Sequence, residues 1–184
     1  MPRIYLEKIT LKDAKEVKEW EIFDEKTLVG YNYSKLSDFE IKLWYGSITS
    51  PMKKYFAVRK IDDDRFIGFL GLKQINPILK RAKLGIVFDR AYVSLGYGTE
   101  AIKLLLDIAF TKVKLKEVYL DVNLFNKRAL RAYQKVGFYP IGESEEVFEN
   151  QDIDFDPKYF VKKSGLIYSK ILQMKIRKDD YYEL

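Results

Sequence analysis

The spacing of apolar residues changes at a short glycine-containing segment, and this change limits the folds open to the chain. Before the segment, three strand-like runs at residues 55–59, 65–75 and 82–88 are separated by turn signals, as in an antiparallel meander. After it, apolar residues recur every three or four positions, which is typical of an amphipathic helix. These residues are Ile102, Leu105, Leu106, Ala109 and Val113, in a helix that we expect to begin near Thr99. Antiparallel strands that lead into helices indicate an α+β fold.

The remaining segments extend this mixed pattern. Ser37 with Glu40 three residues later forms a capping box, and Gly137 is placed to end a helix that Asn126 begins. No linker, repeat or low-complexity segment divides the chain, so we expect one domain over residues 1–184. Its mixed, mostly antiparallel sheet would have about six to seven strands, flanked by about four helices. The further expected strands are 3–9, 118–122, 138–141 and 165–176, and the further expected helices are 11–20, 37–45 and 126–136.

Composition removes several classes of chemistry. The sequence has no cysteine, so disulfides, thiol nucleophiles and thiolate metal sites are excluded. It also has no histidine, which excludes a histidine base and imidazole ligands. We therefore expect no metal site. An enzyme of this composition works through Asp, Glu, Lys, Tyr, Ser, Thr or backbone groups.

The net charge of +6 raises the question of a nucleic-acid partner. The Lys and Arg residues are spread in small clusters, without a basic tail or a nucleic-acid motif, which favours a solvated surface instead. No apolar run is long enough to span a bilayer, and the first residues lack the apolar stretch of a signal peptide. We expect a cytoplasmic protein that binds neither membrane nor nucleic acid.

The glycine-containing segment, Ser94-Leu95-Gly96-Tyr97-Gly98-Thr99, has the features of an anion site. Glycines allow backbone angles that turn successive N–H groups into one concavity. The helix that follows adds its unpaired N–H groups and the positive end of its dipole. The segment therefore predicts a site for phosphate or pyrophosphate, although a tight turn that merely leads into a helix has the same pattern.

The same segment matches a dinucleotide-binding fingerprint, Gly96-x-Gly98-x-x-Ala101, with Asp121 near the expected acidic position. The preceding strand ends near Phe88, however, which leaves a gap of seven residues where the fingerprint requires almost none. The antiparallel strands before it also do not form a βαβ unit. Both points argue against a nicotinamide-dependent oxidoreductase.

A second group of candidate residues lies on the helix that begins at Asn126. Tyr133 lies seven residues later, two turns along the same face and roughly 10 Å away. The small Ala129 between them leaves room for a ligand chain. Tyr133 is protonated at neutral pH and could donate a proton to a leaving thiolate, while Asn126 could bind the amide groups of a pantetheine arm. These residues alone favour the simpler interpretation, in which Asn126 is only a helix cap and Tyr133 only an aromatic at the edge of the core.

The two segments together resemble the acetyl-CoA-binding region of the GNAT N-acetyltransferases. The likeness extends over residues 81–142 and is strongest to the branch with ribosomal-protein N-terminal acetyltransferases and spermidine acetyltransferases. The pyrophosphate loop of that branch is similar to Gly96-Tyr97-Gly98-Thr99-Glu100-Ala101. Its second motif is similar to Asn126-x-Arg128-Ala129-Leu130-x-x-Tyr133-x-x-x-Gly137-Phe138.

The resemblance implies a GNAT fold in which acetyl-CoA lies between two splayed strands, the one ending near Phe88 and the one at 118–122. It implies that a backbone N–H of Val87 or Phe88 binds the thioester oxygen and that Tyr133 protonates the departing sulfur. An amine would attack directly in a ternary complex. The implied cofactor-binding residues are Val87, Phe88, Ser94, Leu95, Gly96, Tyr97, Gly98, Thr99, Asn126 and Ala129. Homodimers are common in the family. A catalytically inert acyl-CoA sensor or interaction module is the alternative.

Two positions depart from the family pattern. Many relatives have Arg or Gln three residues before the first glycine of the loop, where this chain has Val93. Many in this branch also have Glu two residues before the strand glycine Gly85, where this chain has Lys83. A phosphate cradle here must therefore rely on backbone N–H groups, and the family's general base is absent from that position.

An acidic stretch after the second motif bears on the acceptor. Residues 136–157 contain no Lys or Arg, but contain Glu143, Glu145, Glu146, Glu149, Asp152, Asp154 and Asp156. Such a stretch could attract a cationic amine, whether a polyamine, an aminoglycoside or a peptide N-terminus, or it could be a solvated connection between the last two strands. Four aromatic residues could line the acceptor groove or belong to the core: Tyr31, Tyr33, Trp44 and Tyr45.

Overall fold

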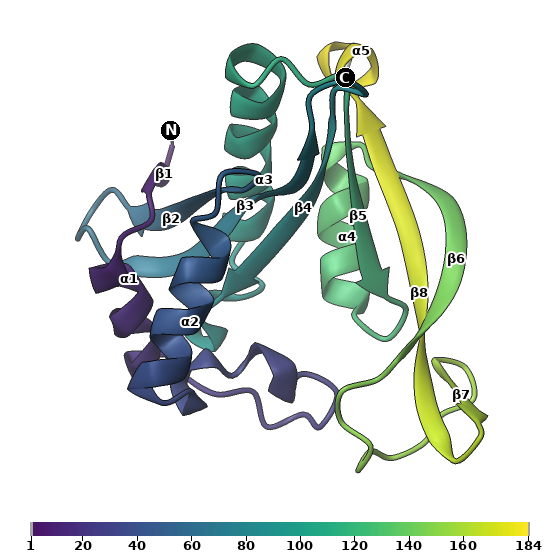
Figure 1. Ribbon diagram of the computed structural model, residues 1–184. Coiled ribbons are helices and arrows are strands. Elements are labelled where there is room, and N and C mark those ends of the chain that lie inside the picture. The colour runs from purple at the N-terminus through teal and green to yellow at the C-terminus, as the bar shows by residue number, and fades with distance from the viewer. Residues whose placement is uncertain (1, 184) are drawn as a thin grey trace.

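A mixed eight-stranded sheet crosses the computed structural model, which describes residues 2–183 (Figure 1). Its strands are β1 (Ile4–Lys8), β2 (Lys54–Lys60), β3 (Phe66–Asn76), β4 (Arg81–Phe88), β5 (Glu117–Asn123), β6 (Tyr139–Val147), β7 (Phe160–Lys163) and β8 (Leu166–Arg177). The strand order is β1-β2-β3-β4-β5-β8-β6, with β7 paired to β8. All neighbours are antiparallel except β4 and β5. The predicted α+β fold with a mostly antiparallel sheet is confirmed, with the short β7 in addition to the expected strands.

Helices cover both faces of this sheet. They are α1 (Leu11–Glu16), α2 (Asp38–Ile48), α3 (Tyr97–Asp107), α4 (Lys127–Val136) and α5 (Lys178–Tyr182). The apolar faces of α3 and α4 pack on one side of the sheet, against residues such as Leu70, Leu84 and Leu120. The helices α1 and α2 pack on the other side, where Phe69 is central. Within residues 2–183, no helix is both long and apolar enough to cross a membrane.

Local sequence signals set the ends of the helices. Ser37 begins α2 with the predicted capping box, in which its backbone N–H donates to the Glu40 carboxylate at 2.7 Å. Asn126 caps α4, and Gly137 ends it with φ of 108°, a left-handed conformation that favours glycine. The first and third expected helices are shorter than predicted, because each ends in a tighter or wider turn, at Val17–Glu19 and Ile108–Lys112.

The acidic stretch, residues 136–157, is only in part a solvated connection between strands. The strand β6 continues to Val147, so Glu143, Glu145 and Glu146 lie on a strand at the edge of the sheet. Charged side chains are typical of edge strands, because they discourage pairing with another chain. Only the residues after Val147 form the connection to β7.

The pairing of β4 with β5 is short, and this feature shapes the site. Residues 81–83 pair with residues 117–119, and the two strands then separate (Figure 1). The rest of β4 is bonded to β3 alone, so its other edge is open toward β5. This is the V-shaped opening that the resemblance to the GNAT family implies.

Candidate active site

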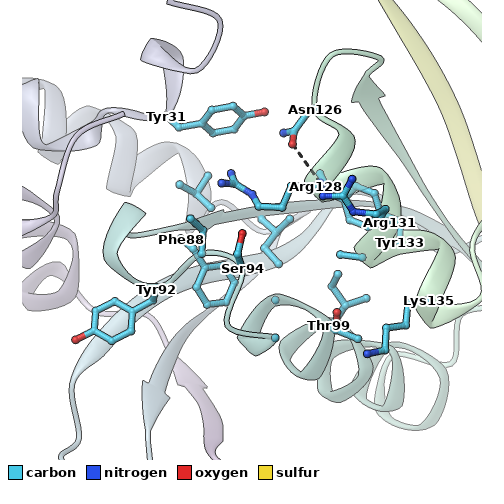
Figure 2. Close-up of a pocket in the computed structure, with 18 of the residues that line it drawn as sticks. Tyr31, Phe88, Tyr92, Ser94, Thr99, Asn126, Arg128, Arg131, Tyr133 and Lys135 are labelled. Carbon is cyan, nitrogen blue, oxygen red and sulfur yellow. Dashed lines mark hydrogen bonds between the residues drawn. The ribbon is translucent and has the colours of Figure 1, made fainter. Parts of the chain in front are cut away.

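A cavity of about 330 Å³ lies between the open edge of β4, the glycine loop and the inner face of α4 (Figure 2). Nine of the eleven predicted site residues line it: Val87, Phe88, Ser94, Gly96, Gly98, Thr99, Asn126, Ala129 and Tyr133. Leu95 and Tyr97 do not line it. Thr99 and Lys135 lie at one end of the cavity, and Tyr31 and Asn126 at the other (Figure 2).

The glycine loop has an unusual backbone. Ser94 has φ of 63° and Gly96 has φ of 87°, so the chain enters the left-handed region twice within three residues. Gly98 follows in the first turn of α3 and lines the cavity. The loop therefore turns around an open space at the N-terminal end of α3, as a phosphate-binding loop requires.

The edge of β4 offers a backbone donor to the cavity. The N–H of Asp89 donates to the carbonyl of Ile67 on β3, at 3.0 Å. Because successive peptide groups along a strand point to opposite sides, the N–H of Phe88 points away from β3, toward the opening. Of the two predicted donors to the thioester oxygen, Phe88 therefore has the suitable direction, and the N–H of Val87 points to β3.

Asn126 and Tyr133 each combine a structural role with a place at the cavity. The Asn126 side-chain oxygen accepts a hydrogen bond from the N–H of Ala129 at 3.1 Å, and its amide nitrogen faces the Tyr31 hydroxyl, where burial raises the pKa of Tyr31 and hydrogen bonding acts to lower it. The amide nitrogen carries two N–H donors, so one is left for a ligand. Tyr133 is only 7% exposed, and its ring packs against Phe138 with centroids 5.9 Å apart. Burial, with a smaller contribution from Tyr31, raises the pKa of Tyr133 well above its usual value. Its hydroxyl therefore keeps its proton at neutral pH.

Sequence reasoning missed three cationic residues of the cavity. Arg128, Arg131 and Lys135 line it, and no Asp or Glu is among its described lining residues. Their spacing of three and four residues places them on one face of α4, and this spacing was the available signal. Burial lowers the pKa of Arg128, and its guanidinium carbon lies over the Phe23 ring, 5.4 Å from the centroid. The cavity is therefore suited to an anionic ligand.

The predicted acceptor aromatics divide into two groups. Tyr31 lines the cavity at the Asn126 end. Tyr33 and Trp44 instead pack on Phe69, with ring centroids 5.3 and 4.8 Å away, and Tyr45 belongs to the same cluster. These three are partly buried and pack against the core between α2 and the sheet, and Trp44 and Tyr45 lie on α2 itself.

Lys83 and Asp121 form an ion pair just where β4 and β5 separate, with side chains 20% and 19% exposed. Asp121 is thus engaged by a lysine and does not line the cavity, which argues against the nucleotide ribose contact of a dinucleotide site. Within residues 2–183, no cluster of three or more acidic side chains is arranged to hold a metal ion.

Comparison with known proteins agrees with this geometry. A family model described as an acetyltransferase (GNAT) domain matches residues 3–139. The chain belongs to the GNAT acetyltransferase family. The spermidine N(1)-acetyltransferase of Escherichia coli (strain K12) is 36% identical over 81 residues, which is 44% of each protein. That of Vibrio cholerae is 32% identical over 116 residues, 63% of this chain and 66% of that protein. The chain thus aligns with less than half of the first of these relatives.

Solved structures support the fold over a longer range. A spermidine N-acetyltransferase from Vibrio cholerae, in complex with CoA and spermine, superposes with a TM-score of 0.75 over 98% of both chains, at 21% identity. At this identity the likeness shows the GNAT fold alone.

Proposed function

We propose that this GNAT protein transfers the acetyl group of acetyl-CoA to a primary amine by direct attack in a ternary complex. The observation that carries the proposal is the cavity itself, which joins a phosphate-type loop, a cationic helix face and a buried, protonated tyrosine beside the open edge of β4. The proposal includes a single domain over residues 1–184 and a cytoplasmic location. A homodimer remains an expectation from the family.

We assign the parts of acetyl-CoA in order to the residues of the cavity. The loop N–H groups of residues 95–99 would hold the pyrophosphate, and Lys135 at the same end, with Arg131 one turn earlier on α4, would bind phosphate oxygens. Asn126 would donate to the pantetheine arm along Ala129. Acetyl-CoA supplies the activated acyl group.

The chemistry would take place where the acetyl group lies between the Tyr133 hydroxyl and the open edge of β4. The N–H of Phe88 would donate to the carbonyl oxygen as negative charge develops there. A carbon–nitrogen bond forms as the carbon–sulfur bond breaks, and Tyr133 gives its proton to the departing sulfur. The attacking amine must lose its own proton to the surroundings. No acyl-enzyme forms, so the reaction does not need a cysteine nucleophile.

The acceptor we propose is a cationic amine, with a polyamine preferred over a peptide N-terminus. The segment after β6 packs against the loop that carries Tyr31, since Lys26 bonds Asp152 at 3.0 Å and the Lys26 carbonyl accepts from Asn150 at 2.9 Å. The Glu149 carboxylate lies against Gly30, and burial followed by the charge of Glu149 raises the pKa of Tyr31. Glu149 therefore places a negative charge beside the cavity end. The names of the spermidine acetyltransferase relatives support the same class of acceptor.

Glu149→Gln is expected to raise the KM for spermidine about fivefold, with kcat changed less than twofold, because one charge that attracts the ammonium is lost. Initial rates at several spermidine concentrations measure this. Glu143→Gln is the matched control, since Glu143 lies in the same acidic stretch but on β6. Equal effects of the two substitutions would mean that the stretch acts only through its total charge.

A direct test of the function follows free thiol while the protein is incubated with acetyl-CoA and a panel of polyamines, peptides and aminoglycosides. We expect release that depends on the acceptor, greatest with a polyamine. Binding of acetyl-CoA without release for any acceptor would instead favour the inert acyl-CoA sensor.

A further inference from the structure

Arg3, just before β1, contacts the glycine loop although it does not line the cavity. Its Nη1 donates to the carbonyl of Leu95 at 3.0 Å, and its Nε donates to the carboxylate of Glu100 at 3.0 Å. The guanidinium also lies over the Tyr97 ring, 4.5 Å from the centroid. The Arg3 side chain thus bonds both the middle of the loop and the first turn of α3.

Glu100 completes this contact. Its Oε1 accepts from the backbone N–H of Arg3 at 2.7 Å and from that of Ile4 at 3.3 Å, in addition to the Arg3 side chain on Oε2. The carboxylate is 23% exposed and lies in the first turn of α3. A negative charge at this place would oppose a phosphate bound at the same helix end, and the guanidinium of Arg3 neutralises it.

The loop needs such a support. Leu95 is 54% exposed and is flanked by Ser94 and Gly96, both in the left-handed region. Side-chain burial therefore does not fix its conformation, and a non-glycine residue with positive φ persists only where surrounding contacts hold it. The bond from Arg3 to the Leu95 carbonyl is such a contact, at the centre of the strained segment.

We propose that Arg3 and Glu100 form a clamp that positions the glycine loop for the pyrophosphate of acetyl-CoA. Arg3 is then a positioning residue, which acts on cofactor affinity through the loop without touching substrate. The inference rests on the proposed function, because it assigns a residue to the same cofactor site.

The test compares two acyl donors, acetyl-CoA and S-acetylpantetheine, of which only the first has a pyrophosphate. Arg3→Ala is expected to lower kcat/KM for acetyl-CoA about tenfold, through KM, and to leave kcat/KM for S-acetylpantetheine unchanged. For Arg3→Lys, kcat/KM for acetyl-CoA should lie between the values of the unsubstituted protein and Arg3→Ala, because one ammonium cannot bond Leu95 and Glu100 in the same forked geometry. In Arg3→Ala, the further change Glu100→Gln should restore part of the acetyl-CoA preference. Lys18→Ala is the control, since it removes a surface ion pair with Asp38 on the other face of the sheet.

The outcomes separate the clamp from the underlying function. Equal losses for both donors in Arg3→Ala, or no loss for either, would overturn the clamp, because the first indicates a general structural role and the second none. Turnover of neither donor by the unsubstituted protein would overturn the proposed function itself. The same comparison can be made at equilibrium, with CoA and pantetheine each displacing a fluorescent acyl-CoA from the protein. Arg3→Ala should weaken the affinity for CoA about tenfold and leave the affinity for pantetheine unchanged.

Discussion

Tyr133→Phe is expected to lower kcat about 10²-fold and to change the Kd for acetyl-CoA less than twofold. The ring of Tyr133 is buried against Phe138, so phenylalanine keeps the packing and removes only the hydroxyl that we propose as proton donor. Steady-state thiol release gives kcat, and equilibrium binding of acetyl-CoA gives Kd. Tyr92→Phe is the control, since Tyr92 lines the same cavity at the glycine loop. Parallel losses in kcat and affinity would contradict the general-acid role.

The pH profile gives a second view of the same residue. A tyrosine whose pKa is raised stays protonated until the pH exceeds that raised value, so its proton is available throughout the neutral and mildly alkaline range. An ammonium acceptor behaves oppositely, because its nucleophilic form increases with pH. The rate of acetyl transfer should therefore rise from neutral pH to about pH 9 and should not fall within that range. A decline in that range would show that another group donates the proton.

The parts of the site that depend on local pattern could be predicted from the sequence. Gly96 marks a left-handed turn before an amphipathic helix, and Asn126 marks the start of the next one; both are signals within a few residues. The strand-like runs between turn signals likewise predict β3 and β4, whereas the open edge at Phe88 is implied by the resemblance to the family. These segments carry their own conformational preferences, so the sequence predicts the elements around the cavity, whereas the roles of Asn126 and Tyr133 come from the resemblance to the family.

The parts that depend on contacts between distant segments could not be predicted. Arg3 and Glu100 are separated by 97 positions, and nothing in the residues around either indicates the other. The approach of Glu149 to Gly30 has the same origin, because it follows from the packing of the segment after β6 on the short 3-10 helix Val29–Tyr31. The strand β7 and the helix α5 have four and five residues, too few for a periodic pattern.

The cationic face of α4 has a local signal, the spacing of its charges, but its place at the cavity depends on distant contacts. A large effect on acetyl-CoA affinity is expected there. The double substitution Arg131→Glu with Lys135→Glu should raise the Kd for acetyl-CoA about 10²-fold to 10³-fold, because two attractive charges at the phosphate end become repulsive. Isothermal titration at two salt concentrations measures this, and the difference from the unsubstituted protein should shrink at high salt.

The matched control for this charge reversal is Lys127→Glu. Lys127 is on the same helix but does not line the cavity, and its ammonium lies over the Tyr159 ring, 5.0 Å from the centroid. Acetyl-CoA bound at the loop would meet Arg131 and Lys135 directly, whereas Lys127 would contribute only to the overall field, which salt screens. The control should therefore change Kd less than threefold. A change as large as that of the double substitution would place the phosphates elsewhere and remove the basis for orienting the pantetheine arm toward Tyr133.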